Sequence, residues 1–300
     1  MTLKKPAFCL VVSAIALAFL PPVMAREQAA APAADEAALL KGILDNTRIY
    51  CQKLNDYAYY FICQEAVTET LRGASKITWT PPPMAGATDQ SPGAVTSQTM
   101  SVSDTSTKNT YLYDYQLIRK NRNNQETRTL LEKNGRRLEI ANAKLEQMRF
   151  YFKNFAFGPV DLFGVVGRLR HEYKILGREK FKGEQAVIVE ASSTAETADY
   201  NPGGKVWIRE GDSAILKIEW DQTAIAGFKD IAAAADAVNA IPAFTLATEY
   251  GVEKNGIRFP SHVLIREAYI RTKSRKTQVV SEVTIDYKNY KFFQVDVETK

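Results

Sequence analysis

Two stretches decide the fold: residues 173–190, which read YKILGREKFKGEQAVIVE, and residues 204–220, which read GKVWIREGDSAILKIEW. Each consists of two strand-like runs, rich in branched and aromatic residues, that meet at a short turn. The turns are Lys182-Gly183 in the first stretch and Gly211-Asp212 in the second. Since a turn this short joins antiparallel neighbours, the two stretches predict consecutive β-hairpins.

Strand-like segments continue on both sides of these hairpins. Asn134-Gly135 and Asn255-Gly256 are further hairpin signals, because Asn and Gly adopt the left-handed backbone that a tight turn requires. The combined pattern predicts an antiparallel meander. Besides the two hairpins, strands are expected at residues 57–72, 111–117, 127–132, 245–252, 257–269, 277–287 and 290–297.

The chain also contains helical patterns. After Asp35, which can cap a helix, apolar residues recur every three or four positions as far as Leu54, and Asn55-Asp56 ends the helix. Helices beside an antiparallel sheet predict an α+β fold. The other helical segments are expected at residues 143–154, 159–169 and, in part, 223–242.

The first 25 residues have the three parts of a cleavable signal peptide. Lys4-Lys5 supplies the positive charge, residues 7–20 form an apolar run, and Val23-Met24-Ala25 provides a cleavage site of small residues. The run falls short of the about 20 residues that span a bilayer, which disfavours the alternative of an uncleaved membrane anchor. We therefore expect export, with residues 26–300 forming a single domain outside the cytoplasm.

Residues 73–109 interrupt the strands with a polar segment. They are dense in Ser, Thr, Pro, Gly and Ala, with Pro81-Pro82-Pro83 in their midst. Such a composition buries too little apolar surface to offset the chain entropy that folding costs. We expect a mobile insertion that is dispensable for folding.

Charge and cysteine content narrow the function classes. Without Lys4-Lys5 the 39 basic residues become 37, against 34 acidic residues, which leaves a net charge of +3. This balance argues against nucleic acid as a partner.

Cys51 and Cys63 are the two cysteines beyond the leader. An even number in an oxidising compartment predicts a disulfide between them, with two buried free thiols as the alternative.

Residue types that carry catalysis are sparse. His171 and His262 are the two histidines of the sequence, and neither has a partner at the spacing of a zinc site or a catalytic triad. The glycine patterns of nucleotide-binding loops do not occur either. We therefore expect no catalytic residues, no metal and no cofactor. A hydrolase that uses a pair of carboxylates stays open, because Asp and Glu are plentiful.

The strands carry many aromatic and branched side chains on one face, and this face has two interpretations. It is either the core of a sheet packed on helices or the wall of a cavity that binds an acyl chain or another apolar ligand. Periodicity alone does not separate the two.

In the order of its elements and in several short sequence segments, the chain resembles the LolA/LolB-type periplasmic lipoprotein-carrier family and the related RseB-type modules. The segments are residues 173–190, residues 204–209 with 215–220, residues 255–260 and residues 283–295. The resemblance implies an unclosed antiparallel barrel, or half-barrel, whose concave apolar face is covered by helices. It also implies a periplasmic protein that carries or senses lipids or lipoprotein acyl chains without catalysis.

On this basis we expect a hydrophobic pocket between the sheet and its helices that binds a lipid or an acyl chain non-covalently. Two other roles stay open, namely a sensor or scaffold that binds an envelope protein, and a hydrolase of envelope polymers. Membrane contact is expected to be peripheral or absent. The candidate ligand-binding residues are Phe163, Leu216, Ile218, Trp220, Val283, Ile285 and Tyr287.

Overall fold

The computed structural model describes residues 31–56, 60–72, 106–120, 123–144, 155–193, 203–224 and 227–293. The expected signal peptide lies outside the described residues, as do residues 73–105 of the expected insertion and residues 145–154 of one expected helix. Residues 106–109, which were also assigned to the insertion, belong to a strand. The described part of residues 40–300 forms one compact unit, to which residues 31–39 at the start of the first helix do not belong.

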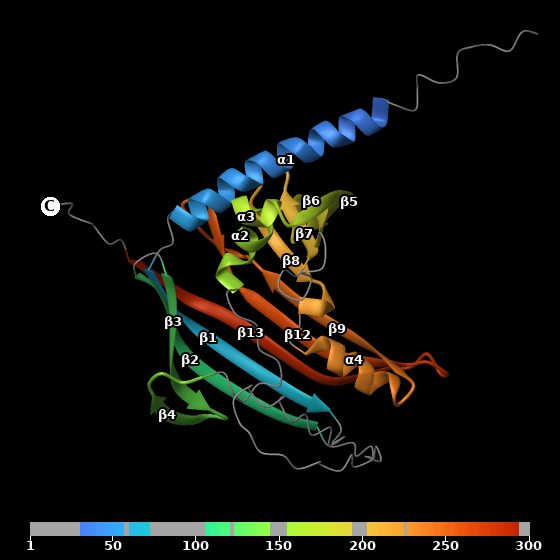
Figure 1. Cartoon of the computed structure of the whole chain (residues 1–300). Coiled ribbons are helices and arrows are strands. Elements are labelled where there is room, and N and C mark those ends of the chain that lie inside the picture. The colour runs from blue at the N-terminus through green and yellow to red at the C-terminus, as the bar shows by residue number, and fades with distance from the viewer. Residues whose placement is uncertain are drawn as a thin grey trace, which may run out of the picture. The chain divides into compact units, whose positions relative to one another are not determined.

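An antiparallel sheet of eleven strands dominates the described part of residues 40–300 (Figure 1). Its strand order is β4-β3-β2-β1-β13-β12-β9-β8-β7-β6-β5, and each neighbouring pair is antiparallel. Because β4 and β5 are both edges, the sheet is unclosed, as predicted. Its strands are β1 (Tyr60–Arg72), β2 (Ser106–Lys120), β3 (Asn123–Lys133), β4 (Arg136–Ile140), β5 (His171–Phe181), β6 (Glu184–Ser193), β7 (Gly204–Arg209), β8 (Ile215–Trp220), β9 (Ala240–Glu249), β12 (His262–Arg271) and β13 (Thr277–Phe293).

Four α-helices accompany the sheet within the described residues, so the α+β prediction is confirmed. α2 lies against β8, α3 against β5 and α4 against β9 (Figure 1). The helix expected at residues 159–169 is two short pieces, because the backbone of Gly164 is extended (φ −63°, ψ 173°) between them. The helices are α1 (Ala31–Asp56), α2 (Gly158–Phe163), α3 (Val165–Arg168) and α4 (Phe228–Asp236).

Alternation along the strands gives the sheet one buried face, which we call the inner face. In β1, the alternate residues Phe61, Cys63, Glu65 and Val67 are buried, while the residues between them are only partly buried. Val67 pairs with Ile285 of β13, so the buried rows continue from strand to strand. The main hydrophobic cluster lies on this face and includes Leu162 of α2, so short helices cover the inner face as expected.

Three local expectations differ from the structure. The chain ends in one long strand, β13, although two strands were expected, because Asn289 takes a left-handed backbone (φ 56°) within the strand without ending its pairing. β9 begins at Ala240, inside the alanine-rich segment expected to be partly helical. The Asn255-Gly256 turn joins β10 (Val252–Lys254) to β11 (Ile257–Phe259), which form a separate two-stranded sheet.

Candidate functional site

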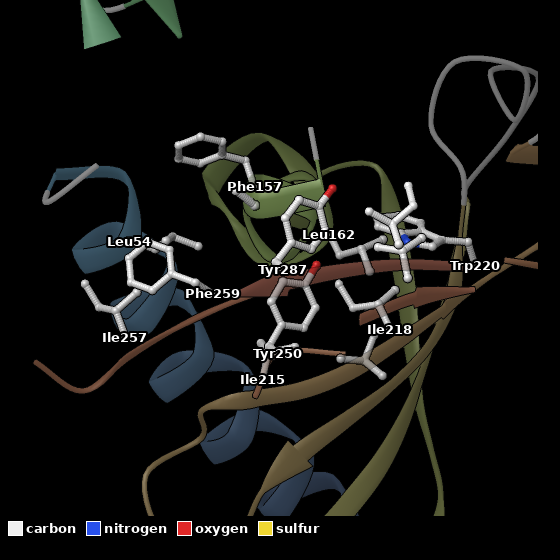
Figure 2. Close-up of a cluster of buried hydrophobic side chains, with 14 of the residues drawn as sticks. Leu54, Phe157, Leu162, Ile215, Ile218, Trp220, Tyr250, Ile257, Phe259 and Tyr287 are labelled. Carbon is white, nitrogen blue, oxygen red and sulfur yellow. The ribbon is translucent and has the colours of Figure 1, made fainter. Parts of the chain in front are cut away.

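Helix α2 sits directly on β8 over the apolar part of the inner face. A Cβ atom added to Gly158 would lie 2.8 Å from Cζ2 of Trp220 and 2.8 Å from the hydroxyl of Tyr250. Leu162 is fully buried, and Figure 2 shows its side chain gathered with those of Ile218, Trp220 and Tyr250. The missing side chain at Gly158 is therefore what lets the helix approach β8 so closely.

Hydrogen bonds to backbone carbonyls hold the α2–α3 segment, which we define as residues 158–169. They join the Tyr173 hydroxyl to Leu162 O (2.6 Å), the Cys51 thiol to Pro159 O (3.2 Å), and His171 Nδ1 to Gly167 O (2.8 Å). The Tyr173 ring also stacks on Phe163, with ring centroids 5.4 Å apart. Each such bond contributes only about 0.5–1.5 kcal/mol net. The segment is thus held by packing and a few modest polar contacts.

The structure brings six of the seven candidate ligand-binding residues into one place. All six are buried members of the main hydrophobic cluster, which extends from β8 across β9 and β12 to β13. The six are Phe163, Ile218, Trp220, Val283, Ile285 and Tyr287.

Leu216 is the candidate that the structure places elsewhere. Simple alternation puts it on the same face as Ile218 and Trp220, but β8 contains a β-bulge. Trp207 of β7 pairs with Lys217, and the next residue of β7 pairs with Ile215, which leaves Leu216 as the extra residue. Leu216 therefore packs with Trp207 in a second, smaller cluster, away from the other six candidates.

Sequence reasoning missed a buried ion pair on the inner face of β1 and β3. Arg128 donates from Nε to one Glu65 oxygen (2.6 Å) and from Nη2 to the other (3.0 Å). The Tyr287 hydroxyl donates to the same carboxylate (2.9 Å), and the guanidinium lies 4.5 Å from the centre of the Tyr115 ring. Glu65 has no exposed surface and Arg128 has 8%. Both charges are therefore buried, paired and hydrogen-bonded.

One sequence signal could have revealed the buried carboxylate of this pair. Glu65 stands between Cys63 and Val67 in the buried register of β1, where a charged residue requires a partner.

A second buried carboxylate, Glu267 of β12, accepts hydrogen bonds from the Tyr269 hydroxyl (2.8 Å) and the Ser281 hydroxyl (2.9 Å). Both carboxylates thus have the satisfied hydrogen bonding typical of buried structural groups.

The disulfide expected between Cys51 and Cys63 is wrong, because both cysteines are free and buried. The Cys51 thiol on α1 faces the carbonyl of Pro159, whereas Cys63 on β1 is hydrogen-bonded with the Tyr290 side chain. Burial raises the pKa of both thiols well above its usual value, so they stay protonated at neutral pH. The alternative of two buried thiols is the correct one.

The histidines have local partners. His171 contacts the Gly167 carbonyl, and His262 Nδ1 lies 2.8 Å from an oxygen of Asp286 across the β12–β13 pair. No group of three or more His, Cys, Asp or Glu side chains arranged to hold a metal occurs in the part of the chain that the structure describes.

Asp161 makes the α2–α3 segment sensitive to pH. Desolvation of the Asp161 carboxyl by the protein around it raises its pKa from 3.8 to about 6, although the residue is exposed to solvent. The charge of His171 has a smaller effect and lowers this pKa. A raised carboxyl pKa means that the folded state binds the proton more tightly than the unfolded state. The resulting stability is present below pH 4 and is lost as the pH rises through about 6.

We therefore expect the Tm of the wild-type protein to fall, relative to that of Asp161→Asn, between about pH 4 and pH 7. Thermal unfolding of both proteins across this range measures the difference. The amide variant cannot titrate, so it serves as the reference. Parallel Tm profiles for the two proteins would show that Asp161 has an ordinary pKa.

Comparisons with known proteins give structural similarity at low identity. No family model matches the sequence, and no curated protein matches it. Among solved structures, a LolA superfamily protein from Nitrosomonas europaea has 11% identity, with 87% of this chain and 97% of that chain covered, at a TM-score of 0.33. An outer membrane lipoprotein-sorting protein domain from Vibrio parahaemolyticus has 12% identity, with 86% and 93% covered, at a TM-score of 0.33.

A third similar structure is a DUF1329 family protein from Desulfovibrio piger. It has 12% identity, with 87% of this chain and 94% of that chain covered, at a TM-score of 0.33. In the described part of this chain, none of the helices has the length and apolar character that crossing a bilayer requires.

Proposed function

We propose that this is an exported periplasmic protein that binds an apolar ligand non-covalently beneath the α2–α3 segment and acts as a carrier rather than as an enzyme. The observation that supports this most is the contrast between a large apolar inner face and the short segment that covers it beside β8. The proposed ligand is a lipid or the acyl chain of a lipoprotein, because the apolar surface that a lifted segment uncovers would take an apolar chain.

The proposed binding surface consists of inner-face side chains that the closed α2–α3 segment covers. Lifting α2 away from β8 withdraws Gly158 and Leu162 from Ile218 and Trp220, which leaves branched and aromatic surface for an acyl chain. The polar contacts that oppose this movement are the bonds from Tyr173, Cys51 and His171. Of the candidate residues, the six in the main cluster belong to this proposal and Leu216 does not.

A reversible lock on the cover tests the proposal. The native Cys51 thiol lies 3.2 Å from the Pro159 carbonyl, so a second cysteine introduced by Pro159→Cys is within reach of a disulfide. The reduced variant is expected to bind an apolar fluorescent fatty-acid probe with a Kd of about 1 μM. The oxidised variant is expected to lose this binding, because α2 can no longer leave β8, and reducing agent should restore it.

The control is Pro159→Cys combined with Cys51→Ser, which cannot form the disulfide and should bind the probe under both conditions. Thiol counting by mass spectrometry confirms that the lock has formed. Failure of the reduced protein to bind any apolar probe would remove the carrier proposal. Equal binding by the locked and reduced forms would leave ligand binding in place but exclude α2 as the cover.

A further inference from the structure

The α2–α3 segment exposes apolar side chains on its outer side, away from the core. Val165, Val166 and Leu169 are exposed by 70%, 57% and 80%, the three largest values among the exposed large hydrophobic residues in the described part of the chain. They fall within five consecutive residues of the sequence. Single exposed apolar residues are ordinary, but such a concentration in one turn indicates a surface that contacts something.

In the closed position this turn packs against the residues beneath it, so its exposure is not that of a loose loop. A Cβ atom added to Gly167 would lie 2.3 Å from the Asp161 carbonyl oxygen, which shows how tightly α3 folds back on α2. Leu162 and Phe163 anchor the inner side of the segment and have no exposed surface. When the segment is closed, its backbone therefore presents Val165 and its exposed neighbours outward.

Basic residues stand among these apolar side chains. Over residues 161–174, Arg168, Arg170 and Lys174 outnumber Asp161 and Glu172, and the only other titratable groups there are His171 and Tyr173. The carboxylate of Asp45 on α1 is within 3.1 Å of Arg168 and 3.0 Å of Lys41, so its charge is balanced by two cations. With Lys41 and Asp45 included, four basic side chains stand against three acidic ones, so the surface combines apolar side chains with one net positive charge.

We propose that this turn docks the protein on the surface of a bilayer that contains anionic phospholipid, with Val165, Val166 and Leu169 entering the interfacial region and the net positive charge of the surrounding side chains adding electrostatic attraction. Apolar residues flanked by Lys and Arg bind such interfaces by burial and electrostatic attraction together. A stable protein interface uses about 20–30 residues a side, far more than this one turn offers. The docking concerns the outer side of the segment, so it does not depend on a ligand beneath it.

The test is vesicle co-sedimentation of the exported form, obtained by expressing the full chain with its own leader. Vesicles of phosphatidylglycerol and phosphatidylethanolamine are compared with vesicles of phosphatidylcholine alone. We expect binding to the anionic vesicles that weakens as salt is raised, and about tenfold weaker binding for the double variant Val166→Ser and Leu169→Ser. The matched control, Val238→Ser with Ile241→Ser, removes two side chains that are 50% and 47% exposed elsewhere and should bind as wild type does.

Three results would overturn the inference: no binding of the wild-type protein to anionic vesicles, binding that the double variant retains, or an equal loss in the control. Sedimentation equilibrium tests whether the turn instead binds a second copy of the chain. A dimer that is lost only in the Val166→Ser and Leu169→Ser variant would assign the turn to that contact. Binding of the fatty-acid probe should be unchanged in that variant, which separates this test from the test of the carrier proposal. If the double variant unfolds, Leu169→Ser alone provides the same comparison.

Discussion

Replacing Arg128 by methionine is expected to lower the free energy of unfolding by about 3–5 kcal/mol, because it leaves the Glu65 carboxylate buried without its cation. The pair is fully inside the sheet, and two guanidinium nitrogens contact the two carboxylate oxygens. Urea unfolding followed by tryptophan fluorescence measures the loss. The matched control is Arg266→Met, which removes a surface ion pair with Glu282 (2.8 Å) from a side chain that is 43% exposed. That change should cost at most about 1 kcal/mol.

A double-mutant cycle separates the pair from the packing around it. Arg128→Met combined with Glu65→Gln should be more stable than Arg128→Met alone, because the amide carries no charge that needs compensation. The Tyr287 hydroxyl can still donate to the amide oxygen at this position. Equal losses for Arg128→Met and Arg266→Met would mean that the inner-face charges are solvated in solution.

Phe61→Ala is the second substitution for which we expect a large loss of stability, about 3–5 kcal/mol. Phe61 is 1% exposed, and its ring lies within 6.0 Å of the Tyr115, Phe259, Tyr290 and Phe292 rings, centre to centre. Truncation leaves a cavity that joins residues from β1, β2, β11 and β13, which cannot all relax into it.

The matched control for this substitution is Phe293→Ala at the end of β13, where the side chain is 47% exposed. Its loss should stay within about 0.5 kcal/mol, as for most surface changes. Urea midpoints and slopes for both variants give the comparison. A small loss for Phe61→Ala would indicate that β1 is not part of the cooperative core.

Local chemistry made most of the sheet predictable. Asn134-Gly135 and Lys182-Gly183 both adopt left-handed backbone at the tips of hairpins, a conformation that Gly in both pairs and Asn in the first favour locally. Alternation then assigned a buried face to each strand. The α+β class and the unclosed antiparallel sheet follow from these two signals and from the family resemblance together.

The errors arise where one residue depends on a distant segment. Alternation fails at Leu216 because a bulge, which depends on pairing with β7, turns the side chain to the other face. The Cys51 thiol bonds to Pro159, which is 108 residues away along the chain, so no cysteine count could reveal it. Arg128 is likewise 63 residues from Glu65. Glu65 could be identified as a buried charge from its position, but its partner could not.

The place of β13 beside β1 has a consequence for biogenesis. The register joins Tyr60 to Phe293, so β1, the first strand among the described residues, must wait for β13, the last of them, before both of its edges are paired. A nascent chain that ends before Thr277 leaves β1 and β12 as open edges, which are sites for mispairing. Assembly of the described sheet is therefore completed only when β13 pairs with both β1 and β12, and such long-range pairing is slow. The strands from β4 to β1 and those from β12 to β5 can pair among themselves before this step, so β13 is the strand that joins the two parts into one sheet.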